Sequence, residues 1–258
     1  MLFASAHDGA SLAWSVTGTG DPLLLISGQG VDSSAWDAVL PVFSARHQVI
    51  TFDHRGTGAS SAGGEQGYTT RSFARDARAV LDAAGVGQAH VYGHSMGGRV
   101  AQWLALDAPE RVGALILGAT TGGDARGFPR TPAATADLAS ADPERLARLF
   151  FEGPGLRDDA KAFFAPGTAR RQRRLHFQAS RAHDTWDQVS GITAPTLVLH
   201  GSDDALTPPA NGERLAELIP RAQLRILTGA RHGYYLEHQS ASAAALEFLA
   251  AHSLTGSL

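Results

Sequence analysis

A short motif around Ser95 constrains the fold more than any other stretch of the sequence. It reads Gly93-His94-Ser95-Met96-Gly97-Gly98, and it follows an apolar run at 89–92 and precedes a helical pattern. In a tight strand-to-helix turn the serine backbone is strained, and small neighbours remove the steric clash. The same letters also occur in ordinary glycine-rich turns, so the context decides. A strand before the motif and a helix after it favour an α/β fold with Ser95 as a candidate nucleophile.

Short apolar runs alternate with helical patterns on both sides of this motif. Such runs are typical of strands that are buried on both faces, and their alternation with helices predicts a mostly parallel sheet covered by helices on both faces. At the start of the chain, 2–6 and 11–17 flank the turn Asp8-Gly9 and predict an antiparallel hairpin, which makes eight strands in all. The buried runs lie at 23–26, 49–52, 89–92, 112–117, 195–201 and 224–227, and the clearest helices follow Asp32 through Phe43 and cover 70–84 and 96–108.

The alternation stops between 119 and 192. Glycines and prolines are followed there by helical stretches near 143–151, 158–164 and 168–187. The segment has 11 basic and 9 acidic residues, a balance of +2, whereas the rest of the chain has 11 and 16, a balance of −5. We therefore expect a core domain formed by 1–118 and 193–258 and an inserted helical lid formed by 119–192.

Two polar stretches have both a functional and a structural interpretation. The loop 53–60 is rich in glycine, but it lacks the lysine and the spacing of a phosphate-binding loop, which favours a structural turn. The arginine-rich run 170–174 could bind an anion or a nucleic acid. Acidic groups surround it and no aromatic residues are interleaved, so a solvated helix face is the preferred interpretation.

The composition excludes several classes of function. The formal net charge of the 258 residues is −3, which gives no electrostatic reason to expect nucleic acid or membrane binding. The chain has no cysteine, which excludes thiolate catalysis, and no cluster of other side chains has the spacing of a metal site. Residues 1–20 have no signal-peptide pattern and no apolar stretch could span a bilayer, so we expect a cytoplasmic protein.

Three chemically reactive groups follow buried strands: Ser95, one aspartate of the pair Asp203-Asp204, and His232. The carboxyl ends of parallel strands lie along one edge of a sheet, where residues distant in sequence can converge. A serine needs a base to accept its proton, and an imidazole base needs a carboxylate to hold its tautomer. The order Ser, Asp, His therefore predicts nucleophilic catalysis. Gln29, in a glycine-rich loop after another strand, can offer a backbone N–H opposite that of Met96 to a developing oxyanion.

Taken together, these motifs resemble the α/β-hydrolase family over nearly the whole chain, and especially its branch of cofactor-free haloperoxidases, esterases and lactonases. The resemblance rests on Ser27-Gly28-Gln29-Gly30, Asp53-x-Arg55-Gly56-x-Gly58-x-Ser60, Gly93–Gly98, 195–204 and 229–233. It implies that Ser95 is the nucleophile, Asp204 the acid, His232 the base, and Gln29 and Met96 the oxyanion donors. Ser27 stands where the family usually has histidine, which affects the hydrogen bonding expected in that loop.

The resemblance implies a serine hydrolase that acts on a small carboxylic ester or lactone without a cofactor or metal. We expect Gly28, Gly30, Trp36, Phe128 and Trp186 to contact the substrate. Carbon–carbon bond hydrolysis and perhydrolysis use the same fold and triad, and some relatives that keep the triad are ligand receptors. The sequence leaves the natural substrate open, and it also leaves open whether the protein is a monomer or a homodimer.

Overall fold

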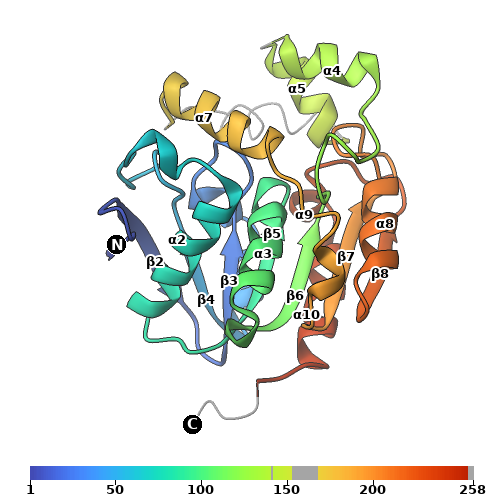
Figure 1. Ribbon diagram of the computed structural model, residues 1–258. Coiled ribbons are helices and arrows are strands. Elements are labelled where there is room, and N and C mark those ends of the chain that lie inside the picture. Colours follow the sequence, from blue (N-terminus) through green and yellow to red (C-terminus); the bar gives the residue numbers. More distant parts are fainter. Residues whose placement is uncertain (141, 153–167, 255–258) are drawn as a thin grey trace.

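The computed structural model describes residues 1–140, 142–152 and 168–254 (Figure 1). Its centre is an eight-stranded sheet with the order β1-β2-β4-β3-β5-β6-β7-β8. The pairs β1–β2 and β2–β4 are antiparallel and all other pairs are parallel, which confirms the expected hairpin and mostly parallel sheet. The strands are β1 Leu2–Ser5, β2 Ser11–Thr17, β3 Asp21–Ile26, β4 His47–Phe52, β5 Ala89–His94, β6 Val112–Gly118, β7 Thr196–Gly201 and β8 Ala222–Leu227.

Helices cover both faces of the sheet because successive strand side chains point to opposite sides. In β3, Leu24 and Ile26 belong to one core cluster, whereas Leu23 and Leu25 belong to the other. Apolar side chains of α2 Thr70–Ala83, α3 Met96–Asp107 and α8 Ala210–Leu218 complete the first cluster. Those of α1 Leu40–Ser44, α9 Tyr234–Glu237 and α10 Gln239–Ala250 contribute to the second. Among the described residues, no helix is both long and apolar enough to cross a membrane.

The helix expected from Asp32 through Phe43 is wrong, because the chain forms two shorter elements there. The Asp32 side chain accepts a hydrogen bond from the Ser34 N–H and caps the 3-10 helix Ser33–Trp36. The α-helix α1 begins only at Leu40 and has Pro41 in its first turn. Proline has no N–H to donate to a preceding turn and is tolerated only in the first turn of a helix, so Pro41 starts a new helix instead of continuing the old one.

The segment between β6 and β7 contains α4 Pro132–Ala139, α5 Pro143–Phe150 and α7 Arg170–Arg181. Figure 1 shows these helices beyond the edge at which the parallel strands end. Helix α4 was not expected; the Thr131 side chain caps it by accepting from the Ala134 N–H. The expected helix 168–187 ends early, at Arg181. The helix expected at 158–164 lies outside the described residues.

The polar loop after β4 is held by an ionic cluster. The Arg55 guanidinium donates from Nε and Nη2 to the two Asp76 oxygens at 2.7 Å each, and from Nη1 to Asp8 at 2.6 Å. Burial opposes the charge on Arg55, but the hydrogen bonds and charges of the two aspartates raise the pKa of its guanidinium. The Asp53 carboxylate accepts from the backbone N–H groups of Ser33 and Ala59. These contacts favour the structural interpretation of the loop.

Candidate active site

Ser95 lies in a sharp turn between β5 and α3. Its φ of 57° and ψ of −118° are strained for a residue with a side chain. The turn packs so closely that a Cβ on Gly93 would overlap the carbonyl of Gly97, and a Cβ on Gly97 would overlap the carbonyl of Ile26. The Ser95 N–H donates to the Gly118 carbonyl at 2.8 Å. The glycines of the motif therefore permit the turn that holds the half-buried Ser95.

The structure brings Ser95, His232 and Asp204 into one hydrogen-bonded chain. His232 Nε2 lies 3.0 Å from Ser95 Oγ, and His232 Nδ1 lies 2.8 Å from Asp204 Oδ2. Asp204 is in the loop after β7 and His232 follows β8, so adjacent strands position the two side chains. Both are buried, with exposed fractions of 3% and 0%. This geometry allows the imidazole to accept the serine proton while the carboxylate fixes its tautomer.

The environment of Asp204 keeps its carboxylate ionised. Its Oδ1 accepts from the backbone N–H groups of Leu206 at 2.9 Å and Thr207 at 2.8 Å. Burial raises the pKa of a carboxyl group, but the charge of His232 and hydrogen bonds from His200 and His232 outweigh it here, so the pKa of Asp204 lies below its ordinary value. Asp203 is exposed and accepts instead from the Ser202 hydroxyl at 2.7 Å. Of the two adjacent aspartates, only Asp204 contacts His232.

His94, beside the serine, supports the histidine loop. It contacts the His232 carbonyl oxygen through Nε2 at 2.8 Å, which makes this nitrogen the donor. Burial, together with the charge of His232, lowers the pKa of His94 to about 3, so the ring is neutral near pH 7. The contact links the end of β5 to the loop that carries His232.

The loop 27–30 passes close to Ser95. A Cβ on Gly28 would lie 3.5 Å from the Ser95 Cβ, and the loop is anchored by His54 Nε2, 3.1 Å from the Ser27 carbonyl oxygen. Within the described part of the chain, the backbone N–H groups of Gln29 and Met96 donate to no protein acceptor. Both are therefore available to a substrate oxygen.

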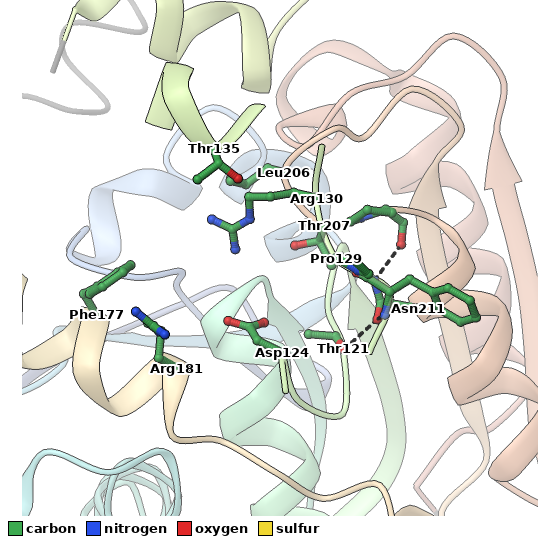
Figure 2. A pocket seen from close by; sticks show the side chains of 12 residues that line it. Thr121, Asp124, Pro129, Arg130, Thr135, Phe177, Arg181, Leu206, Thr207 and Asn211 are labelled. Carbon is green, nitrogen blue, oxygen red and sulfur yellow. Dashed lines mark hydrogen bonds between the residues drawn. The ribbon is translucent and has the colours of Figure 1, made fainter. Parts of the chain in front are cut away.

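A cavity of about 490 Å³ opens above Ser95. The residues that line it include Leu138 of α4, Leu146 and Phe150 of α5, and Phe177 of α7. An adjoining cavity of about 320 Å³, shown in Figure 2, has lining residues in common with the first. The volume and the apolar part of the lining suit a small organic molecule.

The expected substrate contacts divide into two groups. Gly28 and Gly30 line the larger cavity, and the exposed Phe128 lines the smaller one. The expected substrate contacts of Trp36 and Trp186 are corrected by the structure, because neither residue is among the described residues that line these cavities. Trp36 is 1% exposed and packs edge-to-face on Tyr92 in the core beneath the site. The Trp186 ring is also buried in the core, and its indole N–H donates to the Gly123 carbonyl at 3.0 Å.

Sequence reasoning missed the charged residues of the cavity. Arg99, Arg130, Arg173 and Arg181 line it, together with Asp124. Arg173 belongs to the run that was interpreted as a solvated helix face, and its side chain is exposed as expected. The unequal charge of 119–192 was the one signal in the sequence, and it did not single out any residue.

One group of side chains in the described ranges could approach a metal ion. Ligand atoms of Glu152, Glu237 and His238 lie within 4.8 Å of one another. Glu152 and His238 already form an ion pair at 2.7 Å, and the Glu152 N–H donates to Glu237. Because these contacts satisfy the group internally and Glu152 is exposed, the arrangement gives no argument for a bound metal.

The fold agrees with the comparisons to known proteins. A family model described as the alpha/beta hydrolase fold matches residues 21–239, and the chain belongs to this family. The chain is 36% identical to a protein of Azorhizobium caulinodans named "Putative carbamate hydrolase RutD", over 89% of this chain and 91% of that protein. It is also similar to the structure of "Est816 as an N-Acyl homoserine lactone degrading enzyme", with 30% identity, a TM-score of 0.81 and coverage of 95% and 99%.

A third relative is a hydrolase from Pseudomonas aeruginosa, whose structure has 33% identity, a TM-score of 0.82 and coverage of 96% of this chain and 97% of that one. Together with the family match, these similarities make the chain an α/β-hydrolase enzyme of the esterase and lactonase type.

Proposed function

We propose that the protein hydrolyses a carboxylic ester or lactone through an acyl-enzyme formed on Ser95. The observation that carries this proposal is the hydrogen-bonded chain from Asp204 through His232 to Ser95, beneath a cavity that Ser95 lines. The Ser95 oxygen attacks the carbonyl carbon, and His232 Nε2 accepts the hydroxyl proton. The N–H groups of Gln29 and Met96 donate to the oxyanion, and His232 then returns the proton to the departing alcohol oxygen.

Deacylation reverses the roles. His232 Nε2 accepts a proton from water as the water oxygen attacks the acyl carbon, and the proton then passes to Ser95 Oγ as the acid leaves. Every proton that moves is held at His232 Nε2, and the ionised Asp204 stabilises the imidazolium that forms at each stage. The protein's own groups are sufficient for this reaction.

A fluorophosphonate probe tests the proposal. It should label Ser95 of the folded protein, and mass spectrometry of the digested adduct locates the label. Ser95→Ala should lose labelling and lower p-nitrophenyl acetate turnover by several powers of ten, with little effect on folding because truncating a hydroxyl creates little cavity. A label on another residue, or no label on an active sample, would contradict the proposal.

Three alternatives use the same site. A carbamate carbonyl can be attacked in the same way, and the relative with 36% identity is named for carbamate hydrolysis. Parallel assays with matched p-nitrophenyl carbamates and esters distinguish these substrates. A ligand receptor would process either compound once or hardly at all, whereas an enzyme turns it over repeatedly. Perhydrolysis is tested by adding hydrogen peroxide and measuring peracid instead of acid.

We also propose that 119–192 acts as a lid that limits substrate size. The support is that α4 and α5 contribute Leu138, Leu146 and Phe150 to the cavity wall. Leu146→Ala should shift the preference among p-nitrophenyl esters toward longer acyl chains. An equal loss of activity for all chain lengths would instead indicate a role in folding alone.

A further inference from the structure

The larger cavity has an excess of positive charge. Among the described residues that line it, four arginines face one aspartate, a formal balance of +3 in a chain whose net charge is −3. The neutral ester of the proposed reaction gives no reason for this excess. The arginines therefore require an explanation of their own.

Two of these charges already have partners. Arg99 Nη2 donates to Asp124 Oδ1 at 2.7 Å, and its Nη1 donates to the Ser180 carbonyl at the end of α7. The Arg99 side chain is 7% exposed and the Asp124 side chain 33% exposed, so the arginine is the buried partner of the pair. Its hydrogen bonds connect α3 to α7 and to the loop after β6, which is a structural role.

Arg130 and Arg181 differ from Arg99. Neither makes a hydrogen bond or an ion pair with any described residue; Arg181 only approaches the Phe177 ring, with its Cζ 5.8 Å from the ring centroid. Figure 2 shows both guanidinium groups directed into the same open space, Arg130 from the loop before α4 and Arg181 from the end of α7. Both residues line the larger and the smaller cavity.

The surroundings of Arg130 favour an incoming anion. Its side chain is half-buried, and burial lowers the pKa of its guanidinium. The charges of Arg99 and Arg181 add to this effect, whereas those of Asp124 and Asp204 only partly offset it. Removing a charge from water without a partner costs free energy, which an anionic ligand would offset. Guanidinium groups bind carboxylates through paired N–H donors, so two of them suit one carboxylate well.

We infer that the substrate carries a carboxylate that Arg130 and Arg181 bind in the cavity lined by Ser95. This inference rests on the proposed hydrolysis and specifies its substrate class: a half-ester of a dicarboxylic acid, or a lactone with a free carboxylate. Asp124 also lines the space and repels a second negative charge, which favours a carboxylate over a phosphate dianion. The apolar side chains of α4 and α5 contact the carbon chain between the carboxylate and the ester.

The first pair of substrates places the carboxylate in the acyl part of the ester. Mono-p-nitrophenyl adipate has a free carboxylate, and its methyl ester does not. The ratio of their kcat/KM values should favour the carboxylate. Arg130→Met and Arg181→Met should each lower this ratio by about ten- to a hundred-fold, the range for a hydrogen bond to a charged group. Arg174→Met is the matched control, because Arg174 is exposed on the same helix as Arg181 and should leave the ratio unchanged.

A second pair places the carboxylate in the alcohol part: 4-(hexanoyloxy)benzoate against 4-(hexanoyloxy)benzamide. A preference for the charged compound in either pair, lost in Arg130→Met and Arg181→Met, supports the inference and identifies which part of the substrate carries the charge. No preference in either pair, in an enzyme that hydrolyses all four esters, overturns it and leaves the proposed hydrolysis intact.

A binding measurement separates the two proposals. In Ser95→Ala, calorimetry should detect monomethyl adipate but not dimethyl adipate, and adding Arg130→Met should weaken that binding. If Ser95 is not labelled and no ester is hydrolysed while the anion still binds through Arg130, then the proposed function fails and the carboxylate site stands. Equal binding of dimethyl adipate and monomethyl adipate overturns the carboxylate site. Thermal unfolding of each variant verifies that it is folded.

Discussion

The core around Arg55 and the cavity around Arg130 differ in whether their arginine side chains have charged partners. In the core, the Arg55 side chain is 3% exposed and is matched by Asp76 and Asp8. In the cavity, Arg130 and Arg181 have no partner among the described residues. A buried charge with a full set of partners positions the chain, whereas a charge left unpaired at a cavity is available to a ligand. The two regions therefore differ in what the removal of a charge should affect.

The largest effect is expected from a core carboxylate that also belongs to the proposed catalytic chain. Asp204→Asn favours the wrong tautomer of His232 and should lower turnover of p-nitrophenyl acetate by about 10⁴-fold, the scale known for a protease triad. Asp203→Asn is the control and should change turnover little, because Asp203 is exposed and its side chain accepts a hydrogen bond from Ser202 and not from His232. The reverse ranking, with both variants folded, would show that the wrong aspartate has been assigned.

Acid should destabilise the core by several kcal/mol. Burial lowers the pKa of His54 to about 3, that of His94 to about 3 and that of His176 to about 4, against an ordinary value of 6.5. Below pH 6.5 these histidines take up protons in the unfolded chain but not in the folded chain. Their contribution to the free energy of unfolding is therefore fully present above pH 6.5 and is lost as the pH falls toward 4. Denaturant unfolding at pH 7 and pH 5 measures the loss; a constant free energy of unfolding would contradict it.

Removing the core arginine should cost slightly less. Arg55→Met leaves Asp76 buried without its partner and should lower the free energy of unfolding by about 3–5 kcal/mol. Urea unfolding measures this value. Arg71→Met is a suitable control, because the Arg71 side chain is 58% exposed in its ion pair with Asp107 and such pairs contribute less than about 1 kcal/mol. Similar losses in both variants would remove the distinction between buried and exposed pairs.

The smallest effect on stability is expected in the cavity. Arg130→Met and Arg181→Met remove unpaired charges, so the free energy of unfolding should change by less than about 1 kcal/mol in either direction. The same urea experiment compares them with Arg55→Met. A loss as large as that of Arg55→Met would mean that the cavity arginines serve the fold, and the comparison between the two regions would fail.

Much of the fold was predictable because its signals are local. The apolar runs that form the strands are visible in each segment of the sequence. The loops that carry Ser95, Asp204 and His232 were expected to converge because loops after parallel strands lie along one edge of the sheet. The helices that were predicted wrongly or missed are those in which a local feature outweighs the apolar pattern or the pattern is weak. Pro41 divided a helix that apolar spacing alone predicted to be continuous, and α4 has a weak apolar pattern whose beginning is marked only by Thr131 and Pro132.

The sequence by itself determined the turn at Ser95, the order of the candidate triad and the glycine loop beside it, because backbone strain and close approach allow few residue types at these positions. The tertiary structure alone decided which side chains face the site. Loop residues have no period that relates position to direction, so the spacing alone left Asp203 and Asp204 open. The family resemblance indicated Asp204, and the path of the loop after β7 places its carboxylate against His232. Trp36 turned into the core, and Arg130 and Arg181 converged from separate segments, because packing between distant elements sets side-chain direction and no local pattern records it.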